Sequence, residues 1–557
     1  MKRLTYLCLV SLLFASAAPA ARADIFRWEY INPAVPSQGK QQSTTLTPGG
    51  AGVDAVPGAN LSNRNLIVAY LIGADLTAAN LSMTNLTNSD LSQANLTNVD
   101  FTSAIITGAN LTDAVVRGAR FYAIQGGSGE QLYSTASYKA HDLTGIGLGG
   151  LDLTGGNLVG QNLTNADFAD ARLTSVNLTG AEVRGARFDG DGRNGFGGGG
   201  TGITTAQLYS TASYLAQDLT GISLSGNVLT NANFTNQNLT GANLSRAELN
   251  GAILTGAVVR GAIFVGATYF TPTQLYSTAS YQAHDLSGIR LGGNNLTGAN
   301  FSGQNLTNAN LHTATLTRAN FSQANLSAAD LTGANLTGAN LSEATLTDAI
   351  VKNAKLSSTH ITLEQLYSTA SHRDHDLTGV HFVGNDLSGA NFAGQNLVSA
   401  DFYAAKLVGA DFTNANLTAA EFITADLSQA NLTGANLTNG SLALANLSGA
   451  NLAGANFGGS NVTRACDARV IAATHRDLGQ MVRDGTFRQD LYFRLNVVRL
   501  AICPLRERCE DILPLAVHFV EEVADAYEEP VKVLAAEAAD LLVQYDWPGN
   551  VRELRNA

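Results

Sequence analysis

An apolar residue returns at every fifth position over most of the chain. Leu is the commonest residue there, Asn or Asp usually stands directly before it, and a small residue, usually Ala, stands two places before it. Thr or Ser most often follows, so the repeating unit reads A-(N/D)-L-(T/S)-x. The first members of the apolar row are Leu61, Leu66, Leu71, Leu76 and Leu81.

A period of five fits neither regular secondary structure. On an α-helix, five residues advance about 140° beyond a full turn, so the apolar row would scatter around the helix. On a straight strand, an odd period would send successive apolar residues to opposite faces. A backbone that turns once in every five residues instead points each Ala and Leu inward. Stacked coils would then bury each Leu with a gain of about 2 kcal/mol and pair their backbones about 4.8 Å apart.

The stretches ADLTGANLTGANLSEATL, from Ala329, and ADLSQANLTGANLTNGSL, from Ala425, resemble the pentapeptide-repeat family. The resemblance covers about residues 59–463. It implies a mainly β fold, a right-handed quadrilateral β-helix with four units in each coil. Five blocks contain 65 units in all, which predicts about 16 coils and a rod of about 78 Å. Because Arg64 occupies an inward small position, the first coil is expected to be irregular.

The heptapeptide QLYSTAS interrupts the five-residue rhythm four times. Ser or Thr stands three residues before each of its Gln residues, and this spacing is typical of the capping box that begins a helix. We therefore expect short helical inserts against the solenoid, with Leu275 and Tyr276 covering a coil. The predicted helix caps are Ser128, Thr204, Thr271 and Thr362.

The Tyr and His residues of the interruptions raise the alternative of a ligand or metal site. Three copies carry His before the Asp at which the rhythm resumes, but Gln217 takes this place in the second copy. Gln does not readily replace a metal ligand, and no Cys or paired carboxylate pattern accompanies the histidines. We therefore expect packing and hydrogen bonding rather than a metal site. The histidines are His141, His284 and His375, with His372 and His381 beside the last.

The N-terminus has the pattern of an export signal. Lys2 and Arg3 precede a short apolar run, and an A-x-A cleavage site ends at Ala23. The run is too short to span a bilayer comfortably, so no membrane span is expected after cleavage of residues 1–23. Residues 24–58 are rich in Pro, Gly, Ser and Gln, which predicts a linker or an N-terminal cap.

The charge of the chain argues against nucleic acid as a partner. The formal net charge is −12, which disfavours a protein that binds the phosphate backbone. Residues 59–463 carry 26 acidic and 16 basic residues. This density is too low to imitate a duplex, which carries one negative charge per about 1.7 Å. We expect no direct DNA binding and no mimicry of DNA toward gyrase.

The rhythm ends near Arg464, and residues 464–557 are more charged and show helical periodicity. The segments VIAAT, FRQDLYFRL and WPGNVREL are similar to the sensor I strand, the arginine-finger segment and the lid of the AAA+ sigma-54 interaction domain of bacterial activators. This resemblance implies a small, mostly α-helical fragment that includes the lid. It maps the arginine fingers onto Arg488 and Arg494 and sensor II onto Arg552, and His475 replaces the usual Asn after AAT.

Other motifs of that domain do not occur in the sequence. It contains no G-x-x-x-x-G-K-(S/T) phosphate loop, no Walker B Asp-Glu strand motif and no GAFTGA loop that would contact the sigma factor. Arginine fingers act on a nucleotide held by a neighbouring subunit. We therefore expect no ATPase activity from this chain alone and no cofactor, with ATP implied only by the family resemblance.

These patterns favour an exported, non-enzymatic scaffold or protein-interaction solenoid that carries an inactive AAA+ fragment, in the periplasm or outside the cell. The alternative is regulation of sigma-54-dependent transcription in the cytoplasm, through sigma-54 or AAA+ subunits. Because the two ends of the chain indicate different compartments, we interpret it as a fusion, either biological or produced by gene assembly. The sequence does not identify a partner of the solenoid.

Overall fold

The computed structural model describes residues 24–190, 201–463, 478–495, 503–526, 530 and 532–557. The chain divides into two compact units, Met1–Val470 and Ile471–Ala557, each described here by itself. The export signal and His475 lie outside the described residues.

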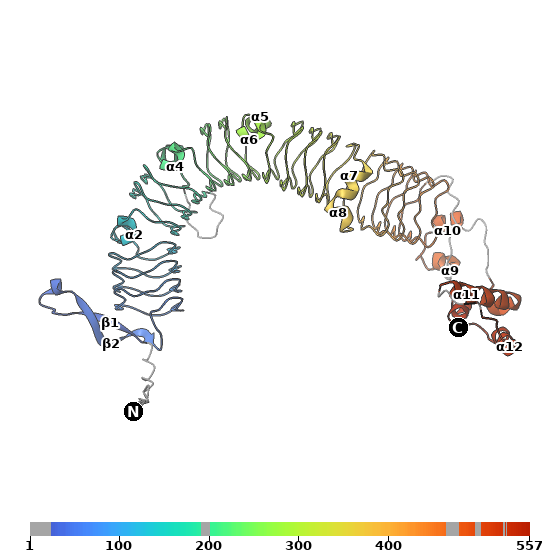
Figure 1. The fold of residues 1–557 in the computed structure, drawn as a ribbon, viewed down its shortest axis with the longest axis horizontal. Coiled ribbons are helices and arrows are strands. Elements are labelled where there is room, and N and C mark those ends of the chain that lie inside the picture. The colour runs from blue at the N-terminus through green and yellow to red at the C-terminus, as the bar shows by residue number, and fades with distance from the viewer. Residues whose placement is uncertain (1–23, 191–200, 464–477, 496–502, 527–529, 531) are drawn as a thin grey trace, which may run out of the picture. The chain divides into compact units, whose positions relative to one another are not determined.

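The first unit is a β-helix solenoid whose coils are 20 residues long (Figure 1). Parallel bridges join residues that are 20 apart, such as Asn80 and Asp100, so four five-residue units complete one coil. The N–H of Leu81 donates to the carbonyl of Asp100 at 2.8 Å, and the N–H of Asp100 donates to the carbonyl of Ala79 at 3.0 Å. These two bonds recur along the stack, so each coil satisfies the backbone groups of the next.

Each residue position of the repeating unit has a defined role in this coil. The central apolar side chains and the small residues before them fill the interior. The Asn directly before the apolar residue stabilises the corner, because Asn85 Oδ1 accepts from the N–H and the hydroxyl of Thr87 at 3.0 and 2.6 Å. The next residue, Asn88, has a φ of 55°. Gly and Asn are frequent there because they tolerate this left-handed conformation best.

Aromatic side chains line up where Phe takes the apolar position in successive coils. Phe402 is fully buried and stacks on Phe382 and Phe422, with ring centroids 5.4 and 4.9 Å apart. The stacked residues are 20 apart in sequence, so the ladder follows directly from the coil length.

An antiparallel hairpin precedes the first coil. Its strands are β1 (Asp24–Tyr30) and β2 (Lys40–Ala51), with a 3₁₀ turn η1 (Pro36–Gln38) between them. The N–H of Trp28 donates to the carbonyl of Val68 at 2.9 Å, and Arg64 donates from Nη1 to the carbonyl of Gly49 at 3.0 Å. Residues 24–51 are therefore an ordered cap rather than a linker, and the irregular Arg64 holds that cap.

Each of the four interruptions forms two short helices, where the sequence predicts one. A second Thr begins the second helix in every copy, as Thr278 does by accepting from the N–H of Tyr281 at 3.2 Å. The pairs are α1 (Gly129–Tyr133) and α2 (Ala136–Lys139), α3 (Thr205–Tyr209) and α4 (Ala212–Leu215), α5 (Pro272–Tyr276) and α6 (Ala279–Gln282), and α7 (Leu363–Ser368) and α8 (Ala370–Arg373).

The second unit is helical in its described residues. A small core of Leu505, Ile512, Ala516, Trp547 and Leu554 holds its C-terminal part together. The elements are α9 (Leu478–Arg483), α10 (Gln489–Leu495), η2 (Leu505–Glu507), η3 (Cys509–Asp511), α11 (Ile512–Ala526), α12 (Ala536–Gln544) and α13 (Asn550–Asn556).

Candidate functional site

The Gln of each interruption supplies hydrogen bonds that the interrupted coil would otherwise lack. Gln274 forms a capping box with Thr271: its Oε1 accepts from the Thr271 N–H at 2.8 Å, and its N–H donates to Thr271 Oγ1 at 3.3 Å. Its Nε2 donates to the carbonyls of Leu249 and Ala252, both at 2.9 Å. Where the stack is not interrupted, a backbone N–H from the next coil donates to the carbonyl of the small residue, as the N–H of Asp100 does to Ala79. The side chain of Gln274 takes the place of that N–H at Ala252.

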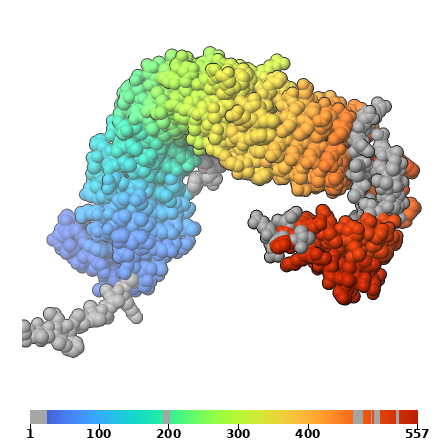
Figure 2. Space-filling view, turned by 45° about the vertical axis from the view of Figure 1, so that its right-hand side comes forward, coloured from blue at the N-terminus to red at the C-terminus, as the bar shows by residue number. Residues whose placement is uncertain are grey.

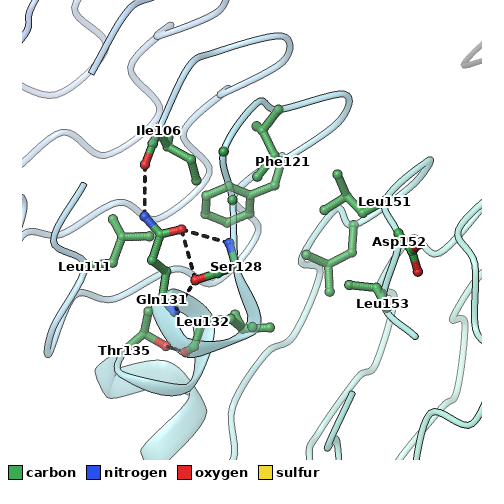
Figure 3. Close-up of a pocket in the computed structure, with 15 residues that line it drawn as sticks. Ile106, Leu111, Phe121, Ser128, Gln131, Leu132, Thr135, Leu151, Asp152 and Leu153 are labelled. Atoms are coloured by element: carbon green, nitrogen blue, oxygen red, sulfur yellow. Dashed lines mark hydrogen bonds between the residues drawn. The ribbon is translucent and has the colours of Figure 1, made fainter. Parts of the chain in front are cut away.

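The other three copies repeat this geometry. Figure 3 shows the bond from Gln131 Nε2 to the carbonyl of Ile106, which is 2.9 Å long. The same nitrogen donates to the carbonyl of Ala109 at 2.8 Å. Ser128, Thr204 and Thr362 are helix N-caps with complete capping boxes, as Thr271 is. The recurring Gln is therefore a structural residue at the edge of a coil.

The Ser and Ala of the interruption continue the hydrogen-bonding ladder. In the third copy the carbonyl of Ser277 accepts from the N–H of Gly256 at 2.8 Å, and the N–H of Ala279 donates to the carbonyl of Ala257 at 2.8 Å. Ser280 Oγ accepts from the N–H of Val259 at 2.9 Å. The motif recurs because each of these residues replaces a backbone partner of the missing coil.

The two aromatic residues of each interruption bind both backbone groups of one residue. The hydroxyl of Tyr276 accepts from the N–H of Asn300 at 2.6 Å. The hydroxyl of Tyr281 donates to the carbonyl of the same Asn300 at 2.9 Å. Burial, followed by the neighbouring Tyr276 phenol, raises the pKa of Tyr281. The equivalent sets are Tyr133, Tyr138 and Asn157; Tyr209, Tyr214 and Asn233; and Tyr367, His372 and Asn391.

An ion pair spans each interruption. Lys352 Nζ lies 2.6 Å from Asp376 Oδ2, the carboxylate at which the rhythm resumes. Burial opposes ionisation of Asp376, but hydrogen bonds from Lys352 and Thr378 outweigh it and hold the pKa below its usual range. The pair is partly exposed, so its contribution to stability is small. Equivalent pairs join Arg117 to Asp142, Arg184 to Asp218 and Arg260 to Asp285.

The histidines of the fourth copy have separate partners. His372 Nε2 lies 3.0 Å from the carbonyl oxygen of Asn391, and His381 Nδ1 lies 3.1 Å from Asp401 Oδ2. In the described ranges, no three His, Cys, Asp or Glu side chains converge on a point where a cation could bind. Each of these two histidines therefore has a hydrogen-bonding partner within the solenoid.

The residues that the resemblance maps onto a nucleotide site lie in the second unit. Arg488 directly precedes α10 and Arg552 lies on α13, and both side chains are exposed. Arg494 lies within α10, but its side chain is outside the described part of the structure, as is the whole of His475. None of the helices within the described ranges combines the length and the apolar character of a bilayer span.

The sequence pattern alone did not identify the tyrosine contacts or the second caps. The signal for the second caps was present, because Thr precedes Tyr or His by three residues in every copy. The signal for the tyrosines was the constant spacing of 24 and 19 residues to one downstream residue, Asn300 in the third copy.

Comparison with known families gives three matches. The family described as Pentapeptide repeats matches residues 58–93, 84–121, 148–190, 218–256, 285–323, 324–362, 376–414, 396–434 and 430–466. The Sigma-54 interaction domain matches residues 455–501, and the AAA+ ATPase lid domain matches residues 506–557. The solenoid, the activator fragment and the lid are therefore all present in this one chain.

Curated relatives match a short stretch of this chain. The chain is 56% identical over 95 residues to the transcriptional regulatory protein ZraR of Escherichia coli O157:H7, covering 17% of this chain and 22% of that protein. It is 54% identical over 95 residues to the alginate biosynthesis transcriptional regulatory protein AlgB of Pseudomonas aeruginosa, covering 17% and 21%. The chain thus spans about a fifth of the length of these relatives.

Two solved structures resemble the solenoid. HetL, a pentapeptide repeat protein involved in heterocyst differentiation regulation from the cyanobacterium Nostoc, is 25% identical. The match covers 47% of this chain and 94% of HetL, with a TM-score of 0.19. QnrB1, a plasmid-mediated fluoroquinolone resistance protein, is 21% identical, and its match covers 35% of this chain and 99% of QnrB1 with a TM-score of 0.21.

Proposed function

The chain belongs to the pentapeptide-repeat family, and we propose that it is an exported, non-enzymatic scaffold whose solenoid binds a protein partner. The observation that carries this proposal is the use of the polar side chains on the inserts. Gln274, Tyr276 and Tyr281 bind the backbone of their own solenoid, and their equivalents do the same. Groups used in this way hold the surface of the solenoid in one shape, which suits a scaffold that binds another protein.

Export is supported by Lys2, Arg3, the short apolar run and the A-x-A site before Asp24. We further propose that the coils wind right-handed around a four-sided interior, as the family resemblance implies.

The C-terminal fragment is proposed to be inactive and to need no cofactor. A chain without a phosphate loop has no cradle for the β- and γ-phosphates of ATP, and the sequence carries no such motif. Arg488, Arg494, Arg552 and His475 are then remnants of a nucleotide site rather than parts of a working one. Full-length protein should therefore leave the fluorescence of a methylanthraniloyl-ATP probe unchanged, whereas saturable binding would contradict an inactive fragment.

Cell fractionation tests the exported scaffold. The mature protein should begin at Asp24 and appear outside the cytoplasm, and affinity capture from that fraction should recover its partner. A matched variant with Leu12→Arg and Leu13→Arg interrupts the apolar run of the signal and should stay unprocessed in the cytoplasm. Unprocessed wild-type protein found only in the cytoplasm would refute export.

A second candidate function is regulation of sigma-54-dependent transcription in the cytoplasm. Its support is the match of residues 455–501 to the Sigma-54 interaction domain. The proposed partners are sigma-54 or the AAA+ subunits of intact activators. Capture of either from cytoplasm by wild-type protein, and its loss after removal of residues 464–557, would favour this function over the first.

The junction between the two parts has its own test. We propose that the fusion is biological or arises from gene assembly, and an uninterrupted genomic read across residues 459–467 from a pure culture would exclude the second origin.

A further inference from the structure

An apolar pocket opens beside the first insert. It has a volume of about 230 Å³ and lies between α1, the coil that ends at Phe121 and the first coil after the insert. Figure 3 shows Phe121 and Leu132 on one side and Leu151 and Leu153 on the other.

The first insert lacks an apolar side chain that the other three inserts have. In the other three inserts a large apolar residue directly precedes the helix cap and is buried: Ile203, Phe270 or Ile361. Such a residue packs against the fourth residue of the helix, an arrangement known as a hydrophobic staple. In the first insert this position is Gly127, so the staple is absent.

The third insert shows what fills the equivalent space. Its loop has the same length, because Thr271 stands seven positions after Phe264 and Ser128 stands seven positions after Phe121. There the ring of Phe270 stacks on Phe264 with the centroids 4.6 Å apart and an interplanar angle of 17°. Phe121 is the equivalent of Phe264 and lines the pocket.

A second difference makes the pocket wall apolar. In the other three copies an Asn follows the insert and donates to the last coil before it, as Asn294 Nδ2 does to the carbonyl of Phe264 at 2.7 Å. The equivalents Asn227 and Asn385 do the same. The first copy has Leu151 at this position, and this side chain lines the pocket.

Two leucines are left partly exposed as a result. Leu132 and Leu153 are only half-buried. Their equivalents in the third copy, Leu275 and Leu296, are fully buried. Covering these two side chains would remove apolar surface from water, which favours binding of an apolar group.

Residues of the loop occupy only part of the space. A Cβ atom built on Gly127 would lie 2.5 Å from Ile124 Cδ1, so the end of Ile124 stands where a side chain of residue 127 would begin. The third insert has the smaller Ala267 at the position of Ile124. The first insert thus replaces an Ala and a Phe by an Ile and a Gly, and a cavity remains.

The polar groups at the pocket have partners in the chain. Gln131 binds the carbonyls of Ile106 and Ala109 and the N–H of Ser128. Asp152 accepts from the N–H and the hydroxyl of Thr154. The pocket therefore favours an uncharged ligand.

We propose that this pocket binds a free, uncharged molecule with a single benzene ring, stacked near Phe121 as Phe270 stacks on Phe264. An apolar cavity of about 150 Å³ is sufficient for benzene, so the volume admits one ring with a small substituent. The proposal does not depend on the protein partner proposed above.

Fluorine NMR of fluorobenzene with the full-length protein tests the site. Wild-type protein should raise the transverse relaxation rate of the fluorine signal, and excess benzene should reverse the effect. The variant Ile124→Ala with Gly127→Phe transplants the loop residues of the third insert and should lose the effect. Equal relaxation with wild type and variant would overturn the proposal, as would no effect with wild type.

The reverse transplant gives a second, independent readout. Ala267→Ile with Phe270→Gly should open an equivalent pocket in the third insert. Combined with the filled first insert, this change should restore the relaxation effect that the filled variant lost. A filled-and-opened protein that keeps its circular dichroism spectrum but does not bind fluorobenzene would contradict the stacking site.

Discussion

Tyr281 donates its hydroxyl to the carbonyl of Asn300, 19 residues away, at 2.9 Å. Together with Tyr276, which accepts from the N–H of the same residue at 2.6 Å, it fastens the insert to the next coil. The contact lies at the surface, but it recurs in the first two inserts through Tyr138 and Tyr214, and His372 takes the same place in the fourth. It explains why aromatic residues that can form hydrogen bonds occupy these two positions of every insert.

The two hydroxyls should have separable effects on hydrogen exchange. Tyr276→Phe removes the acceptor of the Asn300 N–H, so exchange at that amide should accelerate about fivefold, equivalent to a bond worth about 1 kcal/mol. Tyr281→Phe removes only a donor to the carbonyl and should change this amide less. Exchange measured by mass spectrometry checks both, with exposed Tyr269→Phe as the control. Equal acceleration in both variants would contradict this assignment.

Gln274 should contribute more to the stability of its insert than an ordinary helix residue does. Gln274→Leu leaves the carbonyls of Leu249 and Ala252 without its amide, and each lost bond should cost about 1–3 kcal/mol. We expect α5 to open locally, with faster exchange at Leu275 and Ser277.

Gln282→Ala is the matched control for Gln274→Leu, because Gln282 is exposed and its side chain donates to the carbonyl of Tyr276 rather than to an interrupted coil. If the two variants lowered protection of α5 equally, the role assigned to Gln274 would be wrong.

The N-terminal hairpin should detach at acid pH. Lys40 Nζ lies 2.6 Å from Asp90 Oδ2 and 3.7 Å from the ring centroid of Trp28. Burial disfavours the Asp90 carboxylate, but hydrogen bonds from Lys40 and Ser92 outweigh this effect and lower its pKa. The resulting stabilisation is complete above the unfolded value of about 3.9 and is lost as the pH falls through the lower folded pKa.

Fluorescence of Trp28 in a Trp547→Phe background would follow this transition, because the chain has 2 tryptophans. Asp90→Asn removes the titrating group and should abolish this component of the pH dependence. An unchanged acid transition in that variant would show that other carboxylates hold the hairpin.

The second unit should unfold independently of the solenoid when its core is weakened by a mutation. Leu554 is buried against Trp547 and Ile512, so Leu554→Ala should destabilise this unit by about 2–5 kcal/mol. Trp547 fluorescence in a Trp28→Phe background should then change at a lower denaturant concentration. Circular dichroism of the solenoid should keep its midpoint, whereas a joint shift of both signals would indicate that the units unfold together.

The period of five was sufficient to predict a coil, because no helix or straight strand can bury such a row on one side. The S/T-x-x-Q spacing likewise located the helix caps at Ser128, Thr204, Thr271 and Thr362, since a capping box is closed within four residues. Both features depend on residues that are close together in the sequence, so the sequence of a single unit or insert is enough to predict them.

Contacts between distant residues were decided only by the tertiary structure. The role of Gln274 at Leu249, the tyrosines at Asn300 and the hairpin at Arg64 all depend on which coil lies beside which segment. The pocket at Gly127 is of the same kind, because its size depends on Phe121, Leu151 and Leu153 meeting across the insert. The repeat sequence determines the turns and helix caps, which form between neighbouring residues. The contacts and the pocket between distant segments form only when the coils stack.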